Sequence, residues 1–205
     1  MANKTICDGE AIRFGWKKTT ENLGLIIGVT LACIVTMIVS LLICSWIGGL
    51  HRILGFLFTF VYFGVFIYIS VAFLKVMLKI VDGKPAGFGD LLVFDMKVLL
   101  NFFLTVLLNF FIVFLGALLF IIPGMILALK FKFAPLLAID KGLGPIEALK
   151  KSSAMTDGLK WDLFGFYFVS GIVIYIGVLA LGIGVLLSIP TAILGFIYIY
   201  RQLSA

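Results

Sequence analysis

Charged residues are scarce in this sequence. Asp, Glu, Lys and Arg make up 13% of the 205 residues, against about 25% in an ordinary soluble domain. Hydrophobic residues make up 63% of the chain, where a soluble domain has roughly 45–50%. A globular fold of this size could not bury so much apolar surface, so we expect a lipid bilayer to surround most of the chain.

Histidine and cysteine are also too few and too scattered for a recognisable catalytic or metal site. The chain has one histidine, His51, and three cysteines, Cys7, Cys33 and Cys44, without CxxC spacing. Metal sites need clustered ligands, and a thiol inside an apolar run behaves as a small hydrophobe. The sequence also lacks a Ser/His/Asp set, an HExxH motif and a Gly-rich phosphate loop. We therefore predict a protein that is not an enzyme and uses no cofactor or metal.

Four long uncharged runs contain the expected membrane spans: 23–50, 53–74, 98–129 and 163–200. A helix needs about 20 residues to cross a bilayer, so the last two runs are too long for one span each. Gly116 and Pro123 interrupt the third run, and Gly182 and Pro190 interrupt the fourth at a similar spacing. The sequence therefore predicts six spans, near 23–48, 53–79, 98–118, 121–139, 160–181 and 185–203.

Short polar and apolar segments precede each pair of spans. Segment 8–21 places Ile12, Trp16 and Thr19 at helical spacing with cations on other faces, which is typical of a helix in the membrane interface. Segments 86–97 and 145–157 occupy the corresponding places before the second and third pairs. The expected fold is all-α, a single membrane domain over 1–205. Its six transmembrane helices form three hairpins, each preceded by a short interfacial amphipathic helix.

Basic residues divide unevenly between the two sides of this topology. Fifteen of the sixteen Lys and Arg residues fall on the side of both termini, and only Arg52 lies opposite. Because short loops rich in Lys and Arg stay in the cytoplasm, we predict a bacterial inner-membrane protein with cytoplasmic termini. The net charge of +6 is spread over loops rather than gathered on one face, so it does not indicate nucleic acid as a partner.

Lys130 and Lys132 lie within the fourth expected span, where a charge is costly. If that span begins near Pro123, a rise of about 1.5 Å per residue puts Lys130 roughly 10 Å deep. In one interpretation, the lysine lines a cavity or meets an anion there. In the other, the span is broken at Pro135 and both lysines extend their long side chains to the headgroups. Both interpretations remain open at this stage.

Asn101 and Asn109 are the polar side chains of the third expected span. They are eight residues apart, so they lie on roughly one helical face. They are candidates, with Asp140, to assist a substrate near Lys130. Amides within spans also join helices to one another by hydrogen bonds.

A basic patch with hydroxyl groups lies on segment 145–157, at Lys150, Lys151 and Ser152. Each cation near an anionic leaflet contributes about 1 kcal/mol to the binding of phospholipid headgroups. The same cations also serve as ordinary topological charge. The two interpretations are compatible.

The residues from Pro123 onward resemble a bacterial membrane family. They read PGMILALK at 123–130, FAP at 133–135, DKGLG at 140–144 and EALKKS at 147–152. Over residues 85–203 this pattern is similar to the membrane domain fused to some glycerophosphodiester phosphodiesterases. The resemblance implies a six-helix bacterial inner-membrane protein. These 205 residues hold no soluble phosphodiesterase domain, so the resemblance does not extend to hydrolysis.

Two functional hypotheses follow. The first is a non-enzymatic membrane protein that acts as an accessory or scaffold subunit, or in membrane organisation, with lipids, other membrane proteins or its own copies as partners. The second is a small permease, or a transporter of lipids or anions, with a site near Lys130. It is motivated by the interrupted spans, because transporters build their sites where spans are broken at corresponding places in two repeats.

Overall fold

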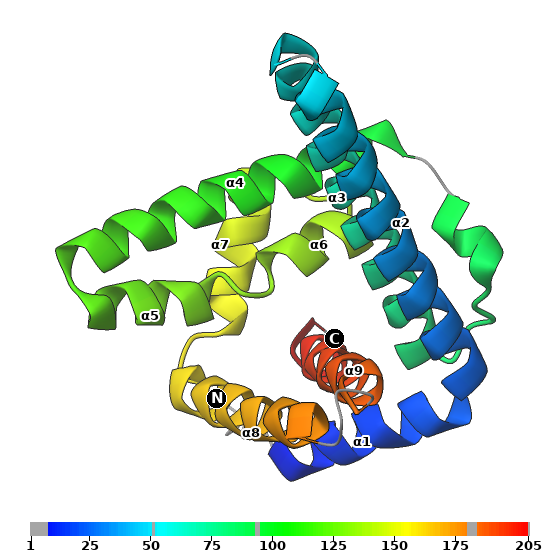
Figure 1. The fold of residues 1–205 in the computed structure, drawn as a ribbon. Helices are drawn as coiled ribbons and strands as arrows, with labels where there is room; N and C mark the ends of the chain where they lie inside the picture. Colours follow the sequence, from blue (N-terminus) through cyan, green and yellow to red (C-terminus); the bar gives the residue numbers. More distant parts are fainter. Residues whose placement is uncertain (1–7, 51, 93–94, 180–183, 205) are drawn as a thin grey trace.

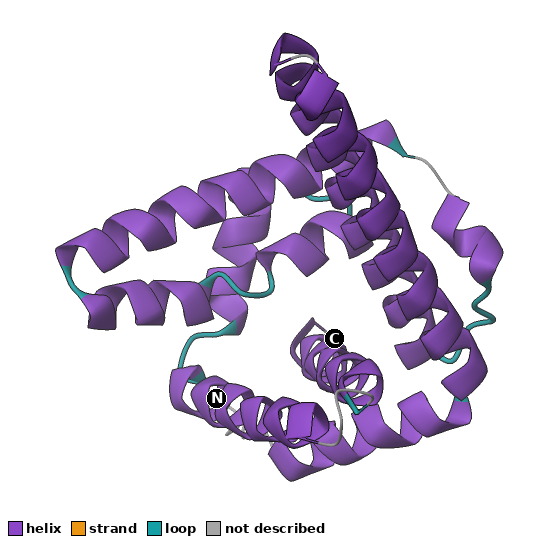
Figure 2. Ribbon diagram, viewed as in Figure 1, coloured by secondary structure: helices purple, strands orange, loops and turns teal. Residues whose placement is uncertain are grey.

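The computed structural model describes residues 8–50, 52–92, 95–179 and 184–204. Within these ranges the chain is 89% helix and has no strand (Figure 2). The helices are α1 (Asp8–Glu21), α2 (Leu23–Leu50), α3 (Arg52–Val81), the 3-10 helix η1 (Phe88–Leu92), α4 (Met96–Leu119), α5 (Ile121–Lys130), α6 (Ala134–Asp140), α7 (Pro145–Met155), α8 (Lys160–Leu179) and α9 (Val185–Ser204). Cys7, His51 and Gly182 lie outside the described ranges.

Six helical segments of the described chain are long and apolar enough to cross a membrane, with α5 and α6 counted together as one. They cover Leu23–Ile47, Gly55–Val81, Met96–Leu119, Ile121–Asp140, Lys160–Leu179 and Val185–Ser204. The prediction of an all-α chain with six candidate spans is confirmed at this level. These apolar helices indicate a membrane protein.

Neighbouring helices in the chain pack in pairs. α2 packs on α3, α4 packs on α5 and α6, and α8 packs on α9. Figure 1 shows the α2–α3 and α4–α5 pairs pointing in different directions away from the region of α6, α7 and α9. The two short helices connect the pairs: α1 packs across α9, and α7 packs on α4 and α6.

Small residues allow α1 to approach α9 closely. A Cβ atom added to Gly15 would lie 2.2 Å from the carbonyl oxygen of Thr191, and one added to Gly195 would lie 2.9 Å from that of Ala11. Beside this crossing, the hydroxyls of Thr19 and Thr191 are 3.0 Å apart. The buried stripe of α1 is therefore Ala11, Gly15 and Thr19, a small residue at every fourth position as in tightly packed membrane helices.

Of the stripe expected on segment 8–21, Thr19 is buried against α9, whereas Ile12 is partly buried and Trp16 is half exposed. The residues one position before Ile12 and Trp16, Ala11 and Gly15, face α9. The placement of this helix in the membrane interface stays a prediction. The second short segment differs from the expected helix over 86–97, since it is the 3-10 helix η1. Asp95 caps α4, its carboxylate accepting hydrogen bonds from the amides of Lys97 and Val98.

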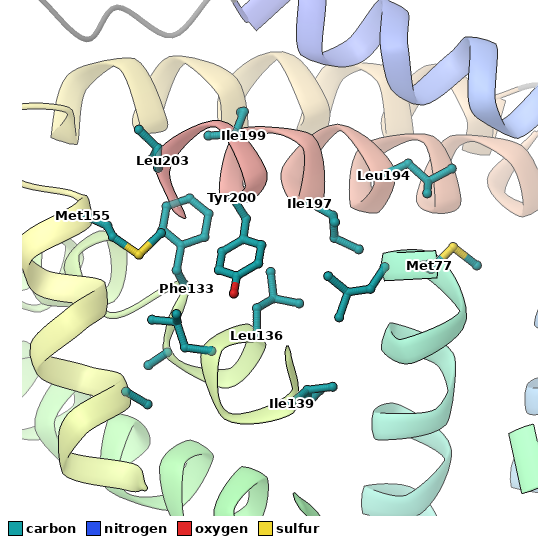
Figure 3. Packing of buried hydrophobic residues seen from close by; sticks show 14 of the residues in the cluster. Met77, Phe133, Leu136, Ile139, Met155, Leu194, Ile197, Ile199, Tyr200 and Leu203 are labelled. Atoms are coloured by element: carbon teal, nitrogen blue, oxygen red, sulfur yellow. The ribbon is translucent and has the colours of Figure 1, made fainter. Parts of the chain in front are cut away.

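The buried core lies where α3, α6, α7 and α9 meet (Figure 3). The ring of Phe133 stacks on Phe196 of α9 with centroids 4.8 Å apart. Leu136 and Tyr200 pack next to it, and Met77 lies on the α3 side. The core therefore surrounds the junction between α5 and α6.

Candidate functional site

The fourth span is broken between α5 and α6, over residues 131–133. Pro135 has no backbone N–H, so it cannot donate to Phe131 as a continuing helix would require. Ala134 instead donates to the Phe131 carbonyl at 3.1 Å, in a tighter turn. A break at Pro135 was one of the two interpretations of the sequence, and α5 and α6 are indeed separate helices.

Ser152 of α7 connects the two ends of the break. Its hydroxyl donates to the carbonyl oxygen of Lys130 at 2.9 Å and accepts from the amide of Phe133 at 3.2 Å. Thr156, the residue that follows α7, lies 3.1 Å from the same carbonyl. These bonds pair backbone groups that the break leaves without helical partners.

The structure gives Ser152 a different role from the headgroup contact that the sequence suggested. Ser152 is fully buried, whereas its neighbours Lys150 and Lys151 are exposed. The helical period explains this separation, because Ala148, Ser152 and Met155 share the inward face of α7. A lipid contact at Lys150 and Lys151 stays a prediction.

Lys132 is the cation at the break that faces a cavity. The cavity has a volume of about 300 Å³ and lies between α8 and α9 with Lys132 at its edge. The Lys132 ammonium is 5.0 Å from the centre of the Tyr167 ring on α8. Lys132 follows Ile121 by eleven residues, so a rise of about 1.5 Å per residue puts it on the order of 16 Å along the span.

Two hydroxyls at this cavity have no hydrogen-bond partner. The Tyr167 hydroxyl and the Ser170 hydroxyl are both buried and unpaired, and both residues line the cavity. Ser170 itself is only 5% exposed. The remaining walls are almost entirely apolar, with Phe166, Ile189 and Phe196 among them. A buried hydroxyl without a partner is costly, and both of these hydroxyls belong to residues that line the cavity together with Lys132.

With α5 and α6 crossing the bilayer as one span, the Tyr167 ring would offset only part of the cost of Lys132. A lysine at the centre of a membrane helix costs about 2.5–3.5 kcal/mol on insertion scales. A cation over an aromatic ring recovers only about 0.5–2 kcal/mol. No carboxylate of the described residues forms an ion pair with Lys132. The exposed side of its side chain is therefore open to an additional partner.

The other predicted residues lie apart from this cavity. Lys130 is half-buried, with its ammonium 5.9 Å from the centre of the Phe131 ring, and it is not among the lining residues. Asn101 donates to the carbonyl of Gly142 at 3.3 Å, which joins α4 to the loop after α6. Asn109 has a buried amide oxygen without a partner. Asn101 thus contacts a loop carbonyl and not a second helix, and a role toward a substrate stays a prediction.

Arg201 forms an ion-pair cluster that the sequence analysis did not identify. Its guanidinium makes two hydrogen bonds to Asp82, at 2.7 and 2.9 Å, and two to Asp140, at 2.7 and 2.9 Å. The Tyr200 hydroxyl donates to Asp140 at 2.7 Å. The carboxylates lie at the C-terminal ends of α3 and α6, where the helix dipole disfavours negative charge. The positive charge of Arg201 compensates the negative charges of both carboxylates. It thereby joins the C-terminal ends of α3, α6 and α9.

A signal for these residues was present in the sequence. Asp82, Asp140 and Arg201 each stand at the end of the second helix of a pair, so they occupy corresponding places in the three units. Tyr167 and Ser170 are three residues apart in an otherwise apolar run, which puts them on one face of α8.

Comparisons with known proteins give distant relatives only. Over 156 residues the chain is 27% identical to uncharacterised proteins of Mycobacterium bovis and of two strains of Mycobacterium tuberculosis. The matched part covers 76% of this chain and 46% of each relative, so the chain spans about half the length of the curated relatives it matches. No family model matches the chain, and no solved structure matches it. The resemblance to the phosphodiesterase-fused membrane domains stays a prediction.

Proposed function

We propose that this protein is a non-enzymatic membrane protein that acts through helix and lipid contacts, as an accessory or scaffold subunit or in membrane organisation. One observation carries the proposal: the helices bury little of their apolar length against one another. In the most apolar 18-residue stretch of Leu23–Ile47, and in that of Gly55–Val81, only 11% of the residues are buried inside the protein. The corresponding share in Val185–Ser204 is 44%. The remaining apolar surface is available to lipids, to other membrane proteins or to further copies of the chain.

The finer architecture is part of the same proposal. Each unit consists of a short helix in the membrane interface followed by a transmembrane hairpin, and both termini lie in the cytoplasm of a bacterial inner membrane. The Arg201 cluster supports this arrangement, because it brings the ends of α3, α6 and α9 to the same end of the molecule. The exposed cations of α7 would then face the inner leaflet.

Photo-crosslinking in the native membrane tests this function. A photo-reactive residue at Leu42 of α2 or at Phe111 of α4, which are 61% and 51% exposed, is expected to form adducts with lipid or with a membrane protein. The matched control is Phe166, which is 1% exposed and is expected to react within the chain. Native mass spectrometry after mild extraction then identifies the adduct partner. Recovery of the chain alone, without lipid or protein, would contradict the proposal.

A second function, transport of a lipid or an anion, is favoured by the Lys132 cavity. The broken span resembles the discontinuous helices at which transporters build their sites. Lys132 lines the cavity and Lys130 does not, so we now expect the transport site at Lys132 rather than at Lys130. In proteoliposomes, Lys132→Leu is expected to abolish flux of an anionic substrate and Lys132→Arg to retain it, while Lys130→Leu leaves it unchanged. Equal flux in all three variants and the unaltered protein would exclude this function.

A further inference from the structure

We infer that the cavity beside Lys132 binds one anionic amphiphile, an apolar chain that carries a carboxylate or phosphate group. Its anionic oxygens contact the Lys132 ammonium and accept hydrogen bonds from the Tyr167 and Ser170 hydroxyls. Its apolar chain lies along α8 and α9. This inference deepens the proposed function, because it names the class of lipid that the protein holds.

The polar groups of the cavity select an anion. An ammonium group has hydrogen-bond donors and no acceptor, while a hydroxyl can donate. The Tyr167 and Ser170 hydroxyls are buried without partners, and Lys132 has no carboxylate partner among the described residues. A carboxylate or phosphate has several acceptor oxygens and a negative charge, so its chemistry matches the donors of all three side chains.

The walls of the cavity select an apolar chain attached to that anion. Apart from Lys132, Tyr167 and Ser170, the lining residues are apolar or glycine. A small inorganic anion would leave these walls without contacts. The volume of about 300 Å³ lies at the lower end of the range for small-molecule sites, which runs from about 300 to 1,000 Å³. It accommodates a headgroup with the first part of one chain, and the rest of the chain continues into the membrane.

Gly171 offers a substitution at the wall of the cavity that leaves its polar groups unchanged. It lines the cavity, and a Cβ atom added to it would meet no other atom within 4 Å. Gly171→Leu therefore places a side chain into open space. Leucine also has a higher helix propensity than glycine, so the substitution is compatible with α8.

The experiment compares matched probes on the full chain, delipidated in a neutral detergent. The probes are oleate, oleyl alcohol with the same chain but no charge, acetate with the charge but no chain, and phosphatidylglycerol as a diacyl anion. Native mass spectrometry is expected to show one bound oleate or phosphatidylglycerol per protein, and neither oleyl alcohol nor acetate. Lys132→Leu and Gly171→Leu are each expected to weaken binding at least tenfold. Lys132→Arg is expected to bind as the unaltered protein does, and so is Lys97→Leu, which removes an exposed cation that does not line the cavity.

Several results would overturn the inference. Equal binding of oleyl alcohol would reduce the site to an apolar pocket, and equal binding of acetate would make it a site for free anions. Unchanged oleate binding in both Lys132→Leu and Gly171→Leu would place the lipid elsewhere. Thermal unfolding of each variant separates loss of binding from loss of fold. Crosslinks from Leu42 or Phe111 report the proposed function independently, because these residues do not line the cavity.

Discussion

The guanidinium of Arg201 holds the carboxylate of Asp140 with two hydrogen bonds, from Nη1 at 2.7 Å and from Nη2 at 2.9 Å. The same guanidinium makes two further bonds to Asp82. One side chain at the end of α9 therefore fixes the ends of α3 and α6. Because α3, α6 and α9 also share the buried core, this cluster adds a polar connection to helices that already pack together.

Arg201→Leu is expected to lower the free energy of unfolding by about 2–3 kcal/mol. The cost lies between the roughly 0–1 kcal/mol of an exposed pair and the 3–5 kcal/mol of a buried one, since the Arg201 side chain is 28% exposed. Thermal unfolding in detergent, followed by tryptophan fluorescence, measures it. The control is Lys18→Leu, which removes the pair with Glu21 on the surface of α1 and is expected to change little. If both variants lost the same free energy of unfolding, the Arg201 cluster would stabilise the protein no more than an exposed ion pair does.

The spans were predictable from sequence because they depend on local composition. An uncharged run of sufficient length can be recognised wherever it lies in the fold. The break at Pro135 was only one of two interpretations, because a proline does not always end a membrane helix, and Pro190 lies inside α9. The contacts between elements were not predictable in this way. Ser152 was interpreted as a surface hydroxyl because two lysines precede it, and only the position of α7 against the break shows its partners. The partners of Arg201 are 61 and 119 residues away in the chain.

The short segments show a second limit of sequence patterns. In segment 8–21 the helical spacing of Ile12, Trp16 and Thr19 indicated an interface helix, but it did not show that Ala11, Gly15 and Thr19 would pack on α9. Membrane helices associate through close approach of their backbones rather than through large apolar side chains. Hydrophobic periodicity therefore identified the helix, and the small residues determined which side of it is buried.

Ser152→Ala is expected to destabilise the protein by about 1–3 kcal/mol, because it leaves the buried amide of Phe133 without an acceptor. Ser153→Ala is the matched control, since that hydroxyl makes none of the hydrogen bonds at the break. The two variants are compared by thermal unfolding under the same detergent conditions. If Ser152→Ala unfolds at the temperature of Ser153→Ala, the Ser152 hydroxyl does not hold the break together.

Gly15→Ala is expected to loosen α1 from α9. The new methyl group would lie 2.2 Å from the carbonyl oxygen of Thr191, so the helices must separate, at a cost of about 1–3 kcal/mol for overpacking. Trypsin cleavage after Lys17 and Lys18 should become faster as α1 opens. Gly9→Ala, in the same helix, meets no atom within 4 Å and is expected to leave the cleavage rate unchanged or lower it. Faster cleavage in both variants would point to a general effect on α1 instead.

The loop after α3 is expected to open in acid. Asp90 accepts a hydrogen bond from Lys79 at 2.6 Å and another from the Gly87 amide at 3.0 Å. The bond from Lys79, followed by that from Gly87, lowers the pKa of Asp90 below its ordinary value of 3.8. Because the folded pKa is the lower one, the stabilisation is complete above pH 3.8 and is lost as the pH falls through the folded pKa.

Hydrogen exchange at the Gly87 and Asp90 amides, corrected for the intrinsic rate at each pH, measures this opening. In the unaltered protein, protection is expected to fall only below pH 3.8. In Asp90→Asn, protection is expected to be lower throughout and independent of pH in this window, because asparagine does not titrate. Asp157→Asn, an exposed carboxylate outside the loop, should retain the profile of the unaltered protein. A pH-dependent loss that persists in Asp90→Asn would assign the opening to another group.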